Sequence, residues 1–317
     1  MIERALRPHA LNRLALGTPR RSVVLRAWLT DAALVGPATL AMLVLIFVPL
    51  LGVALVSFTD YQMGASAISW VGPDNYATLI TDPAGRRALV NTLTYVAIVM
   101  PGSMILALLV ALGIHAVNRW SSTLATVLRT AYFLPVAATL VAMAVVWQIL
   151  LHPSAGLVNE VLGMIGAPAL QWLSDRGLVL YTLAGIGVWE TIGYNMVLFL
   201  AGLSAIPQHY YDAAAVDGAD RPWERFWTVT WPLLGPTTLF VLVVTATRAF
   251  RVFETVVTLT QGGPGFASDT LVYAMYREGF VYFKAGYAAA ISIVFFVCVL
   301  LLTLTQFRVL ERRVHYR

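Results

Sequence analysis

Long apolar runs alternate with short polar segments along the whole chain. Five of these runs contain at most one Asp, Glu, His, Lys or Arg, and a sixth contains three such residues. A helix rises 1.5 Å per residue, so about 20 residues cross a hydrocarbon core about 30 Å thick. The runs predict six transmembrane helices, at about residues 29–57, 88–115, 126–150, 179–204, 235–258 and 285–307. Because the period-two alternation of barrel strands is absent from the sequence, we predict an all-α membrane protein.

The distribution of basic residues predicts how the helices face. Six spans place both termini on one side of the membrane, and fourteen basic residues fall on that side against five on the other. The positive-inside rule therefore predicts that both termini are cytoplasmic. The predicted domains are a basic N-terminal tail, a transmembrane domain and a basic C-terminal tail, at residues 1–28, 29–307 and 308–317.

Composition excludes several classes of protein. Hydrophobic residues make up 59% of the 317 residues and charged residues only 12%, about half the charged share of a soluble domain. The single cysteine, Cys298, can form neither an internal disulfide nor a thiolate metal cluster. The single lysine, Lys284, follows Phe283 and so cannot belong to a phosphate-binding P-loop. We predict that this chain binds no cofactor or metal and catalyses no covalent reaction.

The cytoplasmic connection at about residues 204–234 has the sequence of a short helix–turn–helix. Pro207 suits the first turn of a helix, and three alanines at 213–215 favour its continuation. Gly218 can end that helix at positive φ, and Asp220 is predicted to cap the next one. In the second helix an aromatic stripe is predicted from four residues spaced i, i+3, i+4 and i+7: Trp223, Phe226, Trp227 and Thr230.

This connection resembles the EAA loop of bacterial ABC importer permeases. The resemblance rests on DAAAVDGA at 212–219 and on Trp-Pro at 231–232. TQGGP at 260–264, GYAAA at 286–290 and VGPDNY at 71–76 are similar to the maltose-permease and glycerol-phosphate-permease branch of the same family. The family usually has Glu at the position of Asp212, and the aspartate keeps the charge on a shorter side chain.

The resemblance implies a type I ABC importer permease fold in the bacterial inner membrane. It also implies a second homologous permease, two ATPase subunits that hold ATP and Mg, and an extracytoplasmic solute-binding protein. The loop would then form the coupling helix that contacts an ATPase subunit. The coupling residues implied by the match are Asp212, Ala213, Ala214, Asp217, Gly218, Ala219 and Asp220. The alternative from the residues alone is an amphipathic helix that only anchors the chain at the membrane surface.

Charged residues inside predicted spans are costly and therefore indicate function. Arg248, Arg251 and Glu254 are spaced i, i+3 and i+6 in the fifth span, and Glu190 lies near the middle of the fourth. Arg251 and Glu254 are expected either to pair with each other or to line the substrate pathway. Glu190 and Arg248 are tentative pathway residues too, although Arg248 could instead contact a neighbouring helix or the carboxylate of Glu190. The resemblance implies that the stretch at 250–254 lines the pathway.

Aromatic and amide side chains beside Glu190 suit a sugar ring. Tyr194 and Asn195 are therefore tentative pathway residues, although tyrosine also concentrates at membrane interfaces. Pro101 and Pro135 are predicted kinks.

The function predicted from these patterns is the permease half of a binding-protein-dependent importer for a di- or oligosaccharide. The first alternative is an importer of glycerol phosphate or a glycerophosphodiester, because two arginines in one span suit an anion. The more distant alternative is an ion-coupled secondary transporter, which predicts internal inverted repeats that the sequence does not display.

Overall fold

The computed structural model describes residues 21–310, and every regular element in that range is a helix. The prediction of an all-α fold is confirmed. Residues 1–20 and 311–317 of the two predicted tails lie outside the described residues. The chain divides into two units, Met1–Val53 and Ala54–Arg317, and each is described by itself.

The first unit is one apolar helical stretch. It comprises α1 (Arg21–Met42), a π-helical turn, η1 (Leu43–Phe47), and the start of α2 (Val48–Val56). Residues Asp31–Val56 are long and apolar enough to cross a membrane, in agreement with the first predicted span.

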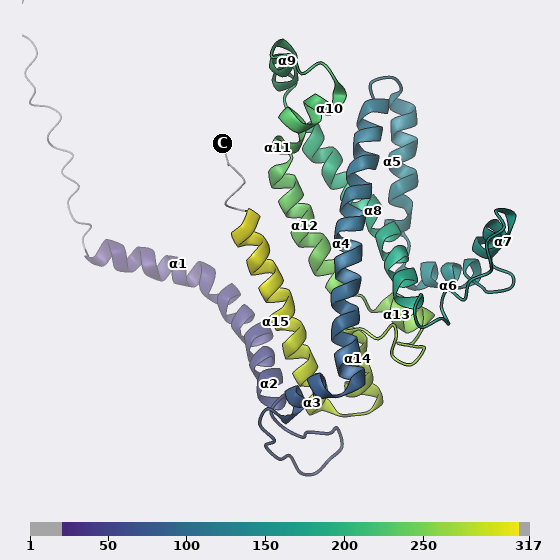
Figure 1. Cartoon of the computed structure of the whole chain (residues 1–317). Helices are drawn as coiled ribbons and strands as arrows, with labels where there is room; N and C mark the ends of the chain where they lie inside the picture. Colours follow the sequence, from purple (N-terminus) through teal and green to yellow (C-terminus); the bar gives the residue numbers. More distant parts are fainter. Residues whose placement is uncertain (1–20, 311–317) are drawn as a thin grey trace, which may run out of the picture. The chain divides into compact units, whose positions relative to one another are not determined.

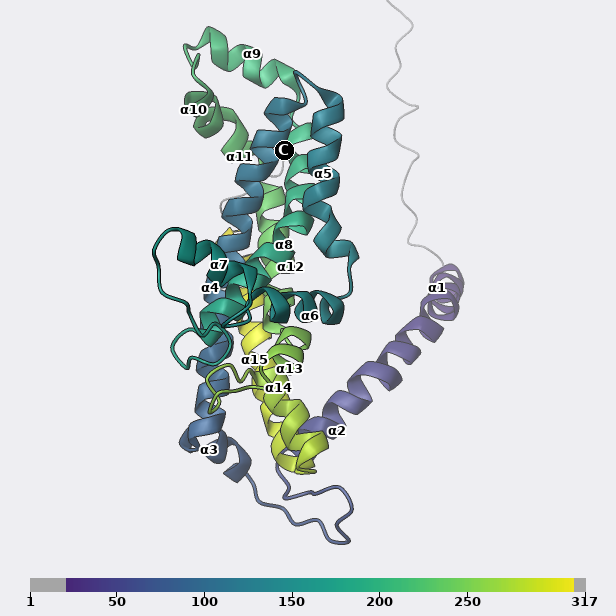
Figure 2. The same ribbon diagram turned by 90° about the vertical axis from the view of Figure 1, so that its right-hand side faces the viewer.

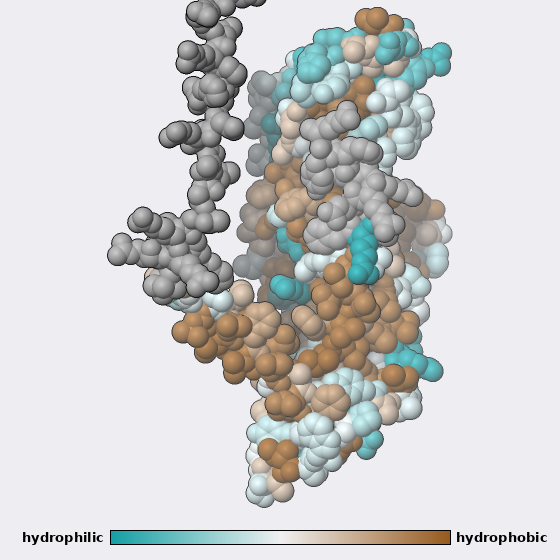
Figure 3. Space-filling model, turned by 90° about the vertical axis from the view of Figure 1, so that its left-hand side faces the viewer, coloured by the Kyte–Doolittle hydropathy of each residue, from teal (hydrophilic) through white to brown (hydrophobic). Residues whose placement is uncertain are grey.

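Five long helices run side by side in the second unit (Figure 1, Figure 2). They are α4 (Pro83–Val117), α5 (Ser122–Ala137), α8 (Val179–Ser204), α12 (Gly235–Phe250) and α15 (Ala285–Leu310). The exposed large hydrophobic residues of α15 include Phe296, Leu300 and Leu301. Hydrophobic side chains, in brown, gather on the uncovered part of the face in Figure 3. Such a surface suits lipid, because contiguous apolar patches of this size are rare on soluble proteins.

Small side chains allow α4 and α8 to pack closely. Ser103, Ala107 and Ala111 recur every four residues on α4, and all three are fully buried. This spacing places them on one face, where helices in lipid associate best through small residues. Phe199 and Leu203 of α8 belong to the same buried cluster as the two alanines.

The third predicted span is not a continuous helix. α5 ends at Ala137, and α6 (Leu140–Leu150) leaves it at 100°. Pro135 has no amide hydrogen to donate and disfavours helical backbone in the residue before it, so the helix stops shortly afterwards. The predicted kink at Pro135 is therefore a break, whereas α4 continues through Pro101.

The fifth predicted span is also interrupted. α12 ends at Phe250, and a short helix, α13 (Glu254–Leu259), begins only after three residues outside α-helix. The segment before α12, at Pro222–Leu233, is bent by 67° from the stretch Gly235–Leu259. Counting each bent pair as one span gives up to six spans in the described residues, and counting only continuous helices gives four.

Shorter helices occupy the two ends of the second unit. α3 (Asp74–Thr81) and α14 (Leu271–Tyr276) lie at one end (Figure 1). A π-helical turn, η3 (Arg277–Val281), follows α14 directly. At the same end α4 begins at Pro83, because the Asp82 carboxylate accepts hydrogen bonds from two backbone amides of the first turn. The remaining outer helix is α7 (Leu157–Met164).

The loop between α13 and α14 is tied to α4. The Asn91 amide donates hydrogen bonds to the carbonyl oxygens of Phe266 and Asp269, at 3.0 and 2.9 Å. The Leu271 amide donates to the Thr92 hydroxyl at 2.9 Å, with both groups buried. The loop that follows α13 therefore has a fixed position against α4.

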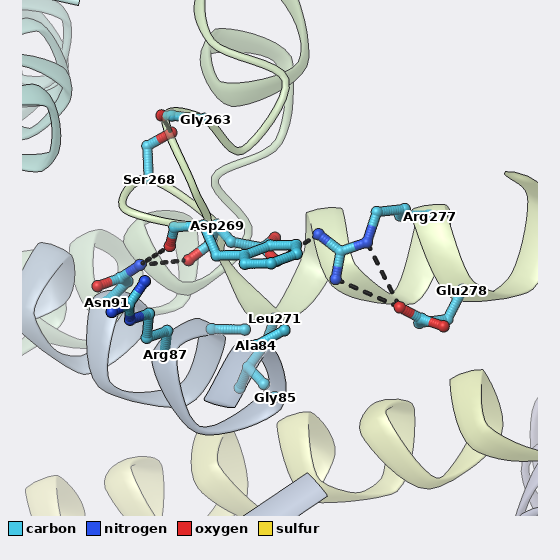
Figure 4. A network of polar contacts seen from close by, with 12 residues as sticks. Ala84, Gly85, Arg87, Asn91, Gly263, Ser268, Asp269, Leu271, Arg277 and Glu278 are labelled. Carbon is cyan, nitrogen blue, oxygen red and sulfur yellow. Dashed lines mark hydrogen bonds and ion pairs between the residues drawn. The ribbon is translucent and has the colours of Figure 1, made fainter. Parts of the chain in front are cut away.

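A buried charge network joins this loop to η3. Figure 4 shows the Arg277 guanidinium directed toward the carboxylates of Asp269 and Glu278. Asp269 is fully buried and pairs with Arg277, whereas the Arg277–Glu278 distance is 3.3 Å. Burial raises the pKa of the Asp269 carboxyl to about 6, and the neighbouring guanidinium limits that rise. Arg277 thus keeps two buried acids in place.

Replacement of Arg277 tests this network. We expect R277Q to lower the free energy of unfolding by about 3 kcal/mol, because it leaves buried carboxylates without their partner. The loss should be larger at pH 8 than at pH 5. Asp269 already has a raised pKa, and its protonation at low pH removes the unpaired charge.

The measurement is thermal unfolding of the purified full chain in detergent at both pH values. R87Q is the matched control, because Arg87 is exposed and donates only to the Gly265 carbonyl oxygen at 2.7 Å. An R277Q loss as small as that of R87Q at pH 8 would refute a stabilising role for the network.

Candidate functional site

The predicted coupling loop forms a protruding segment at the end of the molecule opposite α14 (Figure 1, Figure 2). It comprises α9 (Gln208–Val216), α10 (Pro222–Arg225), a π-helical turn, η2 (Phe226–Thr230), and α11 (Trp231–Leu233). The predicted helix–turn–helix is therefore present.

Gly218 ends α9 as predicted. Its φ is +90°, and its amide donates to the Ala215 carbonyl oxygen at 3.2 Å. The Ala219 amide donates to the Ala214 carbonyl oxygen at 2.9 Å, which completes a Schellman motif. A glycine suits this position because other residues rarely adopt a positive φ.

The cap of the second helix differs from the prediction. The N-cap residue is Arg221, one residue after Asp220. The Glu224 carboxylate accepts a hydrogen bond from the Arg221 amide at 3.0 Å, and Pro222 occupies the first turn. The Glu224 carboxylate thus provides a hydrogen-bond acceptor for the Arg221 amide at the start of the helix.

The aromatic stripe differs from the prediction in one residue, because Trp231 and not Thr230 continues it. Trp227 contacts Trp223 and Trp231 in edge-on geometry, with ring centroids 5.3 and 6.1 Å apart. Thr230, the predicted fourth member, is buried and shares a hydrogen bond with the Tyr211 hydroxyl at 3.1 Å. The π-helical turn adds a residue per turn and so moves Trp231 into the stripe.

The surface of α9 is open. No residue of α9 is buried, and Val216 at its end is 88% exposed. Four of the predicted coupling residues on or beside α9 are exposed: Asp212, Ala213, Asp217 and Gly218. Asp220 is exposed too, whereas Ala214 and Ala219 are half-buried. Such a helix offers a mixed surface of small, apolar and acidic groups for contact.

A second candidate site is a cavity of about 90 Å³ bounded by α8, α12 and the break before α13. Four predicted pathway residues line it, and the structure brings them together from three segments: Glu190, Arg248, Arg251 and Glu254. The cavity lining therefore combines two acidic residues with two arginines, at the middle of α8 and around the break between α12 and α13.

One ion pair joins the two long helices at this cavity. Arg248 of α12 lies 3.4 Å from the carboxylate of Glu190 on α8, and its guanidinium lies 4.7 Å from the ring centre of Tyr194. The Arg248 side chain is 42% exposed and that of Glu190 is 19% exposed. Tyr194 therefore contacts Arg248 but does not itself line the cavity.

The expected pairing of Arg251 with Glu254 is not observed. Neither residue takes part in an ion pair with another described residue within 4.0 Å, and both are exposed. The prediction assumed continuous helical spacing, but the helix is interrupted between these residues. Both groups remain available to a ligand or a partner chain.

Asn195 lies away from the cavity. It is fully buried and bonded on both sides, donating to the Ser103 hydroxyl at 3.3 Å and accepting from the Thr245 hydroxyl at 2.9 Å. These bonds join α8 to α4 and α12. In this structure Asn195 joins three helices and does not line this cavity.

Two aromatic residues of the site were missed in the sequence. Tyr95 of α4 lines the cavity, and Trp147 of α6 packs edge-on against Trp189, with ring centroids 5.3 Å apart. The Trp147 indole nitrogen is buried without a hydrogen-bond partner among the described residues. The available signal was a Tyr or Trp side chain inside an apolar run. Its polar atom usually has a hydrogen-bond partner when it is buried, so such a residue is a candidate for a polar site.

Among residues 21–310, no three His, Cys, Asp or Glu side chains lie close enough together to hold a metal ion.

Comparison with known proteins gives consistent results. Residues 86–316 match the family described as binding-protein-dependent transport system inner membrane component. The sn-glycerol-3-phosphate transport system permease protein UgpA of Agrobacterium fabrum is 36% identical over 251 residues, which cover 78% of this chain and 83% of that protein.

Two solved structures have a similar fold. One is a bacterial ABC transporter involved in the import of the acidic polysaccharide alginate, with a TM-score of 0.77 and 26% identity over 92% of this chain and 98% of the other. The second is a bacterial alginate ABC transporter in complex with an alginate pentasaccharide-bound periplasmic protein, with a TM-score of 0.75, 25% identity and coverage of 92% and 96%. This chain therefore belongs to the family of binding-protein-dependent transport system inner membrane components, the permease subunits of ABC importers.

Proposed function

We propose that this permease forms half of the translocation pathway for a neutral di- or oligosaccharide. The observation that carries the proposal is the charge balance of the cavity, in which Glu190 and Glu254 offset Arg248 and Arg251. A sugar hydroxyl both donates and accepts hydrogen bonds. Carboxylates that accept and guanidinium groups that donate therefore match a polyol without a net charge.

The aromatic side chains support the same substrate. Trp189 lines the cavity and Tyr194 lies against Arg248. The apolar C–H face of a pyranose ring packs well on an aromatic ring, and the ring edges carry polar groups that bond hydroxyls. The cavity volume of about 90 Å³ is smaller than a disaccharide requires, so the pathway would be completed by the second permease.

Glycerol phosphate or a glycerophosphodiester is the second candidate. The exposed Arg251 has no acidic partner among the described residues, and guanidinium groups bind phosphate in a bidentate manner. The similarity to a glycerol-phosphate permease supports this alternative.

The protruding segment is proposed to receive motion from an ATPase subunit. α9 is joined through a short turn to α8, and α11 leads directly into α12. Glu190 lies fourteen residues before the end of α8, about 21 Å along a helix. A push on α9 would therefore reach the Glu190–Arg248 pair through two rigid helices, and the cavity could be exposed alternately to each side of the membrane.

The proposed assembly contains a second homologous permease, two ATPase subunits that bind ATP and Mg, and an extracytoplasmic solute-binding protein. One alginate importer has been solved with a periplasmic protein carrying its solute. The proposed location is the bacterial inner membrane with both termini in the cytoplasm, supported by the arginine distribution. In this assembly the present chain catalyses no covalent reaction.

Substitution of Gly218 tests the coupling role. We expect G218W to abolish ATP-dependent uptake, because the indole enlarges the exposed end of α9 and tryptophan is strained at φ +90°. Membrane insertion should remain normal, since a Cβ atom at this exposed position would have no described atom outside its chain neighbours within 4 Å. Uptake and ATPase association are measured in cells that contain the complete importer.

G218N is the matched control, because asparagine tolerates positive φ and is smaller. It should keep at least half of the uptake. Normal ATP-dependent uptake by G218W would contradict the coupling role, and uptake without any ATPase subunit would favour a secondary transporter.

Paired substitutions in the cavity test the substrate class. For a neutral sugar, R251Q and E254Q should each raise the KM for uptake about tenfold, because each removes a charged hydrogen-bonding group. For a phosphorylated solute, R251Q should reduce uptake far more, whereas E254Q should lower the KM by removing a repulsive charge. Uptake of radiolabelled disaccharide and glycerol phosphate by each variant separates the two candidates.

A further inference from the structure

A larger cavity, of about 410 Å³, lies behind the protruding segment. Its walls come from the last turn of α4, the residues that follow it, the end of α8 and the segment that contains α9, α10 and η2. The apolar part of its lining includes Leu112, Val117 and Leu203. This volume is within the range of a small-molecule site, and nothing in the proposed transport pathway uses it.

The polar lining of this cavity is predominantly basic. Arg119, from the turn after α4, and Arg225 of α10 face it together with His115, and Asp220 is the acidic residue of the lining. The Arg225 side chain donates one hydrogen bond, from Nε to the Ala219 carbonyl oxygen at 2.9 Å. Among the described residues neither guanidinium forms an ion pair within 4.0 Å.

Exposed tryptophans in and near the cavity suit a position at the level of the lipid headgroups. Trp120 lines the cavity and is 92% exposed, and Trp223 on α10 is 67% exposed. Tryptophan concentrates at membrane–water interfaces because its ring is apolar and its nitrogen is polar. The apolar wall formed by α4 and α8 continues into the helices that cross the membrane.

We propose that this cavity binds the headgroup of an anionic phospholipid from the inner leaflet. The phosphate would be held between Arg119 and Arg225, and the upper acyl chains would lie against Leu112, Val117 and Leu203. Basic pockets at the cytoplasmic ends of transmembrane helices bind anionic lipids for these reasons. The choice of leaflet rests on the proposed function, which makes the α9 side cytoplasmic.

A bound headgroup would connect two parts of the protein. Arg119 belongs to the turn between α4 and α5, whereas Arg225 belongs to the segment that carries α9. A phosphate shared by both would fix the protruding segment against the helices of the membrane domain. The lipid would thus act as a positioning ligand for the coupling segment.

The proposal can be tested by native mass spectrometry of the purified full chain with phosphatidylglycerol or phosphatidylcholine added in detergent. We expect one phosphatidylglycerol per chain to be retained, and phosphatidylcholine to be lost. The double variant R119Q/R225Q should bind phosphatidylglycerol roughly 25-fold more weakly, because each arginine near an anionic lipid contributes about 1 kcal/mol, or about fivefold.

Two further variants separate the cavity from the general surface charge. A116F, which fills the cavity while all charges remain, should also lose the lipid. R221Q, which removes an exposed arginine next to the cavity but outside its lining, should retain it. Equal retention by R119Q/R225Q, A116F and the unsubstituted chain would overturn the proposal.

Inorganic phosphate distinguishes a lipid from a free anion. Ten millimolar phosphate should not displace the phospholipid, because phosphate lacks the acyl chains. Displacement by phosphate would identify a soluble-anion site and overturn the proposal. Loss of ATP-driven uptake is a separate readout, so a variant that binds lipid normally but does not transport would count against the proposed function alone.

Discussion

The close contact between α4 and α8 is the constraint on which the rest of the second unit depends. Helices in lipid gain little from burying apolar surface against each other, because lipid is equally apolar. Small residues at 103, 107 and 111 allow the two backbones to approach, and the buried Asn195 then reaches hydroxyl groups on both α4 and α12. The three helices are thereby fixed as one frame.

Both candidate sites are formed by, or connected to, the helices of this frame. α8 carries Glu190 in its middle and leads into α9 at its end, and α12 carries Arg248 and begins directly after α11. The charged cavity and the protruding segment are therefore connected by two continuous helices rather than by loops. In the proposed mechanism, this connection would transmit a displacement of the protruding segment to the cavity.

Sequence patterns predicted the elements well and their interruptions poorly. The apolar runs identified the helices because a span requires about 20 apolar residues, and Gly218 identified the end of α9 because few residues adopt positive φ. The break at Arg251–Phe253 could not be predicted, since the residues before and after it fit a continuous helix equally well. A tertiary bond lies at the break, where the Thr270 hydroxyl donates to the Val252 carbonyl oxygen at 3.3 Å, and such long-range contacts are not visible in the local sequence.

The sequence also leaves open how individual side chains are oriented and which residue caps a helix. Asn195 and Glu190 are five residues apart in one apolar run, and the sequence does not tell which faces the helix interior and which faces a cavity. Asp220 and Glu224 both suit the start of a helix, and only the backbone geometry selects Arg221 as the cap. A π-helical turn displaced the aromatic stripe, and such turns leave little trace in a sequence.

The two charged residues at the interruption between α12 and α13 are not part of the packing of the helices. Arg251 and Glu254 contribute little to holding the helices together, because both are exposed and neither is in an ion pair with another described residue. Substitutions at these two positions are therefore expected to leave the packing of the helices intact. If these side chains contact the solute as proposed, the solute preference of this permease could change while its helical frame stays the same.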